Sequence, residues 1–374
     1  SDSTESGPGQ VHLALGEAED SVWISWVTFD GEGDAGVVKL RPKGAKNESV
    51  IQAATTGYTQ GGWAGHIHHA RVMGLKPDTM YVYRLGGDEG EGPPGSFYMP
   101  DRGVERTRRI DFVAFGDLGV RASAYQTVKA ISLQNERIRV ARALAAGEAD
   151  PAYVPGLDFV LHLGDLAYPK RNGVWSVDKT GYGGEKQHAW DTMFHLISPL
   201  AATVPYMACT GNHEYLPYDY GGVPFRKRFA FPWAQGDESV TYYSFDYGPV
   251  HLLALNAEES LAPGSRQHAW LLDDLAAYQT RRRHSPHVTW TIVLVHRPLY
   301  SSTMHNRAAD PGPVMGSNLT LRAHLEPVLE QFGVDLVLTG HDHAYERTYP
   351  VMGAVTYADD ADDVFVDPPY PIHV

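Results

Sequence analysis

The sequence contains a single cysteine, Cys209, among its 374 residues, so no disulfide can form within the chain. No apolar run approaches the roughly 18 residues that a membrane-spanning helix needs. Basic residues are also few, because 31 lysines and arginines stand against 45 acidic residues, for a formal net charge of −14. A nucleic-acid-binding surface must neutralise phosphates, so this charge argues against a nucleic-acid partner. The composition therefore excludes an internal disulfide framework, predicts no membrane span and disfavours nucleic-acid binding.

Helical patterns are missing from residues 8–100, where short alternating apolar segments are separated by turn residues. The segments read VHLALG, SVWISWVTF, GVVKLRP, HHARVMGL, MYVYRLG and GSFYM. This alternation predicts an all-β sandwich. The stretch LKPDTMYVYRLG resembles the tyrosine-bearing corner of fibronectin-type-III-like domains. We therefore expect a fibronectin-type-III-like sandwich over 8–100 and a hydrophilic linker over 101–109.

Residues 110–374 alternate between apolar strand-like segments and longer helical stretches, which predicts an α/β domain. The strand-like segments read DFVAF, LDFVLHL, VPYMACT, TWTIVLV and VDLVLT. The helical stretches read YQTVKAISLQNERIRVARALAAG, HAWDTMFHLISPLAA, QHAWLLDDLAAYQTRR and LRAHLEPVLEQFG. The stretch VTYYSFDYGPVHLLALN reads as a hairpin, so antiparallel pairing is expected as well.

Five short blocks follow these strand-like segments, and each carries side chains that bind metals. The blocks are GDLG, GDLAY, GNHE, VHRP and GHDH, and their candidate ligands are Asp117, Asp165, Tyr168, Asn212, His296, His341 and His343. Open α/β sheets bind ligands at the carboxyl ends of their strands, so we expect these side chains to converge at the edge of one sheet. Any one of them alone is as readily a turn or core residue. The ordered set of five indicates a site.

The ligand chemistry indicates which metals fit. Carboxylate, amide, phenol and imidazole groups without a thiolate suit iron, zinc or manganese. One metal takes about four to six ligands, so seven candidates predict two metals that share a bridge. Asp165, in a tight turn at a strand end, is the expected bridging carboxylate.

In this order the five blocks resemble those of the purple acid phosphatases, within the calcineurin-like metallophosphoesterases, from about Val11 to the C-terminus. The resemblance implies an α-β-β-α sandwich of mixed sheets for residues 110–374. It implies a ferric ion held by Asp117, Asp165, Tyr168 and His343. It implies a divalent zinc, iron or manganese ion held by Asp165, Asn212, His296 and His341. Gly119 stands where most metallophosphoesterases carry the histidine of a D-x-H block, and Tyr168 takes its place.

A tyrosine ligand fits a trivalent ion. The free pKa of tyrosine is about 10, so only a strong Lewis acid keeps a phenolate ionised in neutral or acidic solution. The resemblance thus implies hydrolysis of phosphate monoesters at acidic pH by a binuclear Fe(III)–M(II) centre. Metal-bound hydroxide would be the nucleophile, small phosphorylated molecules the substrates and inorganic phosphate the product.

Two further histidines are candidates for catalysis. His213, beside Asn212, is placed to hydrogen-bond the phosphate and protonate the leaving alkoxide, or alternatively to orient its loop. His305 lies in the breaker-rich loop SSTMHNRAADPGP, where family members carry histidines that contact substrate. Asn306 occupies the position of a second such histidine in plant members, and an amide cannot transfer a proton. A solvated loop histidine is the alternative for His305.

Other residues are expected behind the ligands or away from them. Glu214, Tyr345, Glu346 and Arg347 resemble family positions that orient the ligands. His162 is expected in the core or behind the ligands. His66, His68 and His69 form a tempting cluster, but they fall in the N-terminal domain, and we expect them on a strand face and loop edge.

The termini and sequons bear on processing. The chain starts at Ser1 without a signal-like segment, so a removed signal peptide is expected. It stops at Val374 as a strand begins, which suggests truncation or proteolytic processing and a catalytic domain without its final strands. Asn47 and Asn318 head glycosylation sequons, which fit a secreted, vacuolar or lysosome-like glycoprotein. Cys209 is expected to be a buried thiol, with a bond to a C-terminal fragment or a second subunit of a homodimer as the alternative.

Two other functions remain open at this stage. A phosphodiesterase or nucleotide pyrophosphatase would use the same metal pair and differ only in the room around the second ester. A catalytically silent adhesion or storage glycoprotein is the alternative from another class, and the intact ligand set argues against it. The sequence does not name the natural substrate, the divalent metal or the oligomeric state.

Overall fold

A computed structural model describes most of the chain. The described residues are 7–29, 36–87, 90–91, 94–103, 109–151, 154–169, 187–215, 219–237, 239–285, 287, 289–302, 318–352, 355–356 and 372–373. His305 lies outside them. None of the helices within these ranges is long and apolar enough to cross a membrane.

The N-terminal region consists of two antiparallel sheets packed face to face. The first has the order β1-β2-β6-β5, with bounds Gly9–Leu15, Val22–Thr28, His66–Val72 and Ala54–Thr56. The second has the order β4-β3-β7-β8, with β9 also beside β7, and bounds Ser49–Gln52, Val37–Pro42, Thr79–Gly87, Gly90–Glu91 and Gly95–Met99. Alternation produces the buried face: Val38 and Leu40 of β3 are buried, whereas Lys39 between them is half-buried. The predicted all-β architecture is confirmed.

The C-terminal region contains two further sheets. One is parallel, with the order β10-β11-β12 and bounds Phe112–Phe115, Phe159–Leu163 and Tyr206–Cys209. The other has the order β13-β14-β15-β16-β19, with bounds Tyr243–Tyr247, Val250–Leu255, Trp290–Val295, Leu336–Leu338 and Ile372–His373. Its β13–β14 pair is the antiparallel hairpin predicted from the sequence, and its other pairs are parallel. A short hairpin, β17 (Val351–Met352) and β18 (Val355–Thr356), lies apart.

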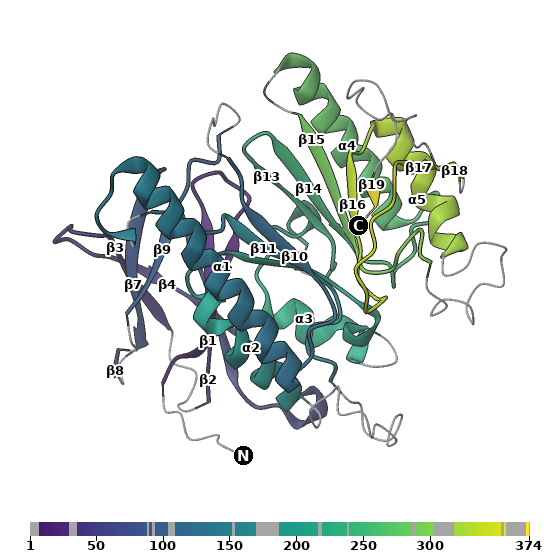
Figure 1. The fold of residues 1–374 in the computed structure, drawn as a ribbon. Coiled ribbons are helices and arrows are strands. Elements are labelled where there is room, and N and C mark those ends of the chain that lie inside the picture. Colours follow the sequence, from purple (N-terminus) through teal and green to yellow (C-terminus); the bar gives the residue numbers. More distant parts are fainter. Residues whose placement is uncertain are drawn as a thin grey trace.

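Helices cover the outer faces of these two sheets. Their bounds are Ala122–Ala146 (α1), His188–Ala201 (α2), Val223–Arg228 (α3), Arg266–His284 (α4) and Leu319–Phe332 (α5). Short 3-10 turns are Gln60–Gly62 (η1), Asn212–Glu214 (η3), Tyr220–Gly222 (η4) and Ala234–Gly236 (η5). In Figure 1, α1 and α2 lie beside the β10–β12 sheet, and α4 and α5 lie on the far side of the second sheet. Phe159 of β11 packs edge-on against Tyr247 of β13, with ring centroids 4.9 Å apart, so the two sheets face each other. The result is the α-β-β-α arrangement.

A buried arginine joins the N-terminal and C-terminal regions. Arg228, 1% exposed, donates from Nε to the Tyr58 hydroxyl (2.8 Å) and from Nη1 to Gln10 Oε1 (2.9 Å). Its Nη2 donates to Asp191 Oδ1 (2.8 Å), and its guanidinium lies 4.6 Å from the ring centre of Trp63. Each of the three guanidinium nitrogens thus has a partner, and the Asp191 carboxylate balances the charge, which lowers the penalty for burying it.

Two histidines in the same joint, His12 buried and His69 half-buried, should make it sensitive to acid. His12 Nε2 bonds the Arg228 carbonyl (3.0 Å), and His69 Nε2 bonds the Lys227 carbonyl (3.0 Å). Burial lowers the pKa of His12 to about 3 and that of His69 to about 4, against 6.5 ordinarily. Unfolding returns both pKa values to about 6.5. At a pH between the folded and the unfolded pKa the unfolded state therefore binds more protons, so the free energy of unfolding falls as the pH drops below 6.5. We expect each histidine to lower the free energy of unfolding by up to about 3 kcal/mol between pH 7 and pH 4.

Urea unfolding at a series of pH values measures this effect. His12→Gln should lose less stability than the wild type over the same pH interval, because glutamine binds no proton. His284→Gln, on the exposed end of α4, is the matched control and should follow the wild type. Equal acid sensitivity of His12→Gln and the wild type would contradict the assignment.

Candidate metal centre

The five sequence blocks lie at the carboxyl ends of five parallel strands. Asp117 follows β10, Asp165 follows β11, Asn212 follows β12, His296 directly follows β15, and His341 follows β16. The expectation of a single sheet is wrong. Three strands belong to one sheet and two to the other, because the β13–β14 hairpin starts a second sheet whose strand ends face those of the first. The crevice is therefore built from both.

The backbone at the strand ends is held in an uncommon conformation. Asp117, Asp165, Tyr168 and His341 have positive φ angles of 58°, 52°, 52° and 72°. Such angles are rare outside glycine and cluster at functional sites, where the surrounding structure enforces them. Each turn aims its side chain back across the strand ends.

One group of candidate ligands consists of Asp117, Tyr168 and His343. The Tyr168 hydroxyl lies 2.9 Å from Asp117 Oδ1 and 3.0 Å from His343 Nε2, and His343 Nε2 lies 3.2 Å from Asp117 Oδ1. Asp117 Oδ2 also accepts the backbone N–H of His341 (2.8 Å). One carboxylate, one phenol and one imidazole thus meet at a single point.

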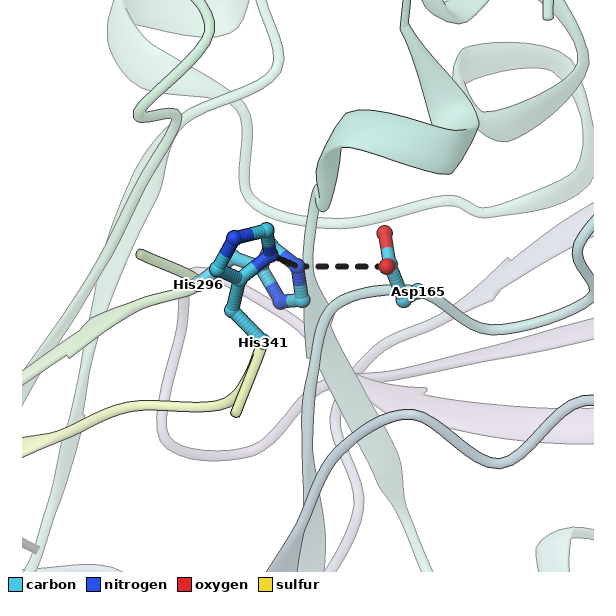
Figure 2. A group of neighbouring side chains, drawn as sticks. All are labelled: Asp165, His296 and His341. Atoms are coloured by element: carbon cyan, nitrogen blue, oxygen red, sulfur yellow. Dashed lines mark hydrogen bonds and ion pairs between the residues drawn. The ribbon is translucent and has the colours of Figure 1, made fainter. Parts of the chain in front are cut away.

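A second group consists of Asp165, His296 and His341, whose ligand atoms all lie within 4.8 Å of one another (Figure 2). His296 Nε2 lies 3.3 Å from Asp165 Oδ2 and 3.3 Å from His341 Nδ1. The other nitrogen of His296, Nδ1, bonds the Leu163 carbonyl (2.7 Å). That bond fixes the ring so that Nε2 faces the group, as is usual for metal-binding histidines.

Asn212 supplies a buried oxygen that lacks a partner. Its side chain is 8% exposed, and among the described residues Oδ1 has no hydrogen-bond partner. A buried unpaired carbonyl costs about 1–3 kcal/mol unless a ligand satisfies it. Gly211, just before it, allows the close approach: a Cβ there would collide with Asp165 Oδ1 and N. An oxygen donor is therefore held ready beside Asp165.

Glu214 and His162 lie behind these groups. Glu214 is fully buried and accepts the backbone N–H groups of Asp165 (2.8 Å), Leu166 (2.8 Å) and Gly211 (2.9 Å). It thereby ties the GDLAY turn to the GNHE turn. His162, also fully buried, bonds the Tyr206 hydroxyl through Nδ1 (2.7 Å).

The electrostatics of the crevice favour bound cations. Burial opposes protonation of His296, but Asp165 overrides it and raises the pKa of His296 to about 10. Burial, and then the carboxylates of Asp165 and Asp117, raise the pKa of Tyr168 well above its ordinary value. Positive charge is thus stabilised in the crevice, and a phenolate can exist there only beside a cation. Together with the orphaned Asn212 oxygen, the donor set fits two metal ions.

His213 lies at the mouth of the crevice. Its ring centre is 4.3 Å from that of Tyr168, its backbone N–H donates to Asp165 Oδ1 (2.9 Å), and its side chain is 31% exposed. Burial lowers the pKa of His213. Tyr345 is 84% exposed, Arg347 is exposed, and Glu346 accepts from Ser302 N and Oγ (3.0 and 3.1 Å). That the last three orient the ligands stays a prediction.

The remaining residues singled out in the sequence lie elsewhere. His68 bonds Thr28 Oγ1 (2.9 Å) and Thr55 Oγ1 (3.0 Å), and His69 bonds Ser25 Oγ (2.7 Å). Both ring nitrogens of His68 and Nδ1 of His69 are thus engaged in the N-terminal sheet, and Nε2 of His69 bonds the Lys227 carbonyl, which fits the strand-face interpretation. Asn47 is exposed, whereas the Asn318 side chain accepts from Leu321 N (2.9 Å) and caps α5. Cys209 is a buried free thiol.

Sequence reasoning missed one ion pair beside the crevice. Arg297 is paired through Nε and Nη2 with the Glu258 carboxylate, and its Nη1 lies 3.5 Å from His341 Nε2. The only sequence signal was the position of Arg297 directly after His296 in the VHRP block.

Comparison with known proteins places the chain in a family. Residues 8–99 match the model of the purple acid phosphatase N-terminal domain, and residues 110–345 match that of the calcineurin-like phosphoesterases. Purple acid phosphatase 18 of Arabidopsis thaliana is 30% identical over 99% of this chain and 71% of its own length. The chain belongs to the purple acid phosphatase family.

Two other purple acid phosphatase relatives extend the comparison. Acid phosphatase type 7 of Homo sapiens is 29% identical over 99% of this chain and 77% of its own length. The solved structure of purple acid phosphatase PPD1 from yellow lupin (Lupinus luteus) seeds matches with a TM-score of 0.77 and 25% identity. That match covers 98% of this chain but 64% of the lupin chain. The predicted order, an all-β domain followed by a metallophosphoesterase domain, agrees with these relatives.

Proposed function

We propose that the protein hydrolyses phosphate monoesters in acidic solution with a ferric and a divalent ion bound in the crevice. The observation that carries the proposal is the convergence of two ligand groups and the orphaned Asn212 oxygen at five strand ends. Membership of the purple acid phosphatases supports it. When bound, such a cation pair supplies Lewis acidity toward phosphoryl oxygens and a water of lowered pKa.

Different side chains would bind the two metal ions. Asp117, Tyr168 and His343 would hold the ferric ion, and Asn212, His296 and His341 the divalent zinc, iron or manganese ion. Asp165 would bridge the two, since it lies 3.3 Å from His296 and its charge also raises the pKa of Tyr168. Glu214 keeps that carboxylate in place through the Asp165 N–H.

Proton transfer is assigned to His213. Its ring lies against Tyr168 and is 31% exposed, so it would face an ester bound at the two ligand groups. A histidine within hydrogen-bond reach of the leaving oxygen can donate a proton as the bond breaks. His305 is a second candidate for substrate contact, on the predicted loop that follows His296.

Several wider assignments belong to the same proposal. Residues 8–100 would form a positioning domain, 101–109 the linker and 110–374 the catalytic domain. The sequons at Asn47 and Asn318 fit a glycoprotein that is secreted, vacuolar or lysosome-like. Partners would be small phosphorylated molecules, and a homodimer or a C-terminal fragment remains open as a protein partner.

Rates on two chromogenic esters test the function. Metal-loaded protein should hydrolyse p-nitrophenyl phosphate much faster than bis-p-nitrophenyl phosphate, with a maximum below pH 7. Faster hydrolysis of the diester would favour the phosphodiesterase alternative. An absence of turnover on both, with metals bound, would favour a catalytically silent glycoprotein.

Tyr168→Phe should abolish a visible absorption band. A phenolate bound to ferric iron absorbs visible light, and phenylalanine removes the oxygen while keeping the ring that packs on His213. Absorption spectra of the purified, iron-loaded proteins measure the change. Tyr125→Phe, at a 60% exposed position on α1, makes the same chemical change elsewhere and should keep the band. An unaltered spectrum of Tyr168→Phe would remove this residue from the ligand set.

A further inference from the structure

A polar cavity lies next to the candidate metal centre. It has a volume of 420 Å³ and is bounded by the loop that follows β14 and by the start of α5. Arg297 forms its wall toward the centre, because Arg297 lines the cavity while its Nη1 lies 3.5 Å from His341 Nε2. The volume falls in the range of about 300–1,000 Å³ that small-molecule sites occupy.

The charge of that wall is balanced. The Glu258 carboxylate, 14% exposed, takes the Nε and Nη2 donors of Arg297, which is 22% exposed. A guanidinium has five N–H groups, so donors remain on its Nη1 side after this pairing. The wall therefore offers N–H groups without a net positive charge.

The other walls supply hydrogen-bond acceptors and donors. Glu259 lines the cavity and is held through Oε1 by Thr241 Oγ1 (3.0 Å) and Asn256 Nδ2 (3.2 Å). Across from this loop, α5 contributes the Thr320 hydroxyl and the His324 imidazole. A ligand that both donates and accepts hydrogen bonds can pair with the polar groups of this lining. A purely alkyl ligand would remove them from water without giving them hydrogen-bond partners.

We propose that this cavity binds the alcohol part of the ester and favours hydroxyl-rich alcohols over alkyl ones. The inference rests on the proposed phosphomonoesterase function and adds its substrate class. An ester whose phosphate sits at the metal ligands extends past His341 and Arg297 into the cavity. The hydroxyl groups of the alcohol part then donate hydrogen bonds to the Glu259 carboxylate and accept them from Thr320 and His324.

Two primary alkyl esters with equivalent leaving oxygens test the preference. Glucose 6-phosphate carries hydroxyls beyond the ester carbon, and ethyl phosphate carries none. We expect kcat/KM for glucose 6-phosphate to exceed that for ethyl phosphate by at least about tenfold, the effect of one to three hydrogen bonds. Asn318 lines the cavity and heads a sequon, so the cavity assignment requires that Asn318 carries no glycan, and the protein is made in a host that does not glycosylate.

Variants show whether the cavity is responsible. Ser260→Trp, which fills the cavity from an exposed position on its rim, should bring the ratio close to one. Thr320→Val should lower it by about threefold to tenfold through the lost hydroxyl. Thr280→Val makes the same change on the exposed face of α4 and should leave the ratio as in the wild type.

The outcomes separate the two proposals. A wild-type ratio near one, or a ratio that Ser260→Trp leaves unchanged, overturns the cavity assignment if p-nitrophenyl phosphate is still hydrolysed. Failure of the metal-loaded wild type to hydrolyse p-nitrophenyl phosphate and both alkyl esters overturns the proposed function, and the cavity assignment with it.

Discussion

Asp165→Asn is expected to lower kcat/KM for p-nitrophenyl phosphate by about 10³-fold or more and to reduce the content of both metals. Asparagine keeps the shape of the Asp165 side chain but removes the negative charge of its carboxylate. That carboxylate lies against His296 and accepts a hydrogen bond from the GNHE turn. Loss of the charge that holds a cation pair removes several kcal/mol of transition-state stabilisation, and each 1.36 kcal/mol is a factor of about ten. Steady-state kinetics and elemental analysis measure the two effects.

Two companion variants sharpen the Asp165 result. His341→Gln should deplete the divalent metal and leave the ferric ion, because His341 belongs to one ligand group only. Asp273→Asn, an exposed position on α4, repeats the chemical change away from the crevice and should keep full activity. Loss of a single metal in Asp165→Asn would argue against a bridge.

Arg228→Met is expected to destabilise the protein by about 3–5 kcal/mol. The variant removes the hydrogen bonds to Tyr58 and Gln10 across the joint, and it leaves the carboxylate of Asp191 without its cation. Trp63 Nε1 still donates to Asp191, at 3.1 Å, but an indole carries no charge to balance a buried carboxylate. The free energy of unfolding in urea measures the loss.

The environment of the ion pair decides the size of this effect. Arg266→Met breaks the exposed pair of Arg266 with Asp237 and should destabilise the protein far less than Arg228→Met does, because water already solvates both of these charges. The double variant Arg228→Met/Asp191→Leu should recover part of the loss, since it leaves no unpaired charge. Equal destabilisation by Arg228→Met and Arg266→Met would contradict the account of the joint.

Much of the fold follows from local patterns. Strong period-2 alternation located the strands β1, β2, β3, β7 and β9, and long amphipathic stretches located α1, α2, α4 and α5. The short strands β4 (Ser49–Gln52) and β5 (Ala54–Thr56) were missed, because their residues are mostly exposed and only pairing with β3 and β6 defines them. The helix α3 was also missed, because six residues are too few to show a helical period. Tertiary contacts, not local sequence, specify such elements.

The candidate site was partly predictable. Apolar strands followed by Asp, Asn or His gave six of the seven candidate ligands, because the carboxyl ends of parallel strands converge, and the GDLAY block gave Tyr168. The division of the strands between two sheets could not be predicted from the sequence, because pairing between strands far apart in the chain leaves no local pattern. The positive φ angles of Asp117 and His341 could not be predicted either, because the surrounding tertiary structure imposes them. The Glu258–Arg297 pair and the Arg228 joint were also invisible, because their partners are far apart in sequence.

Anomalous X-ray diffraction at the iron and zinc edges tests the central claim most directly. We predict two peaks in the crevice of the metal-loaded protein, one beside Asp117, Tyr168 and His343 and the other beside Asn212, His296 and His341. Asp165 should lie between them with one oxygen toward each. A crevice without anomalous signal, or peaks that lie away from these side chains, would contradict a binuclear centre.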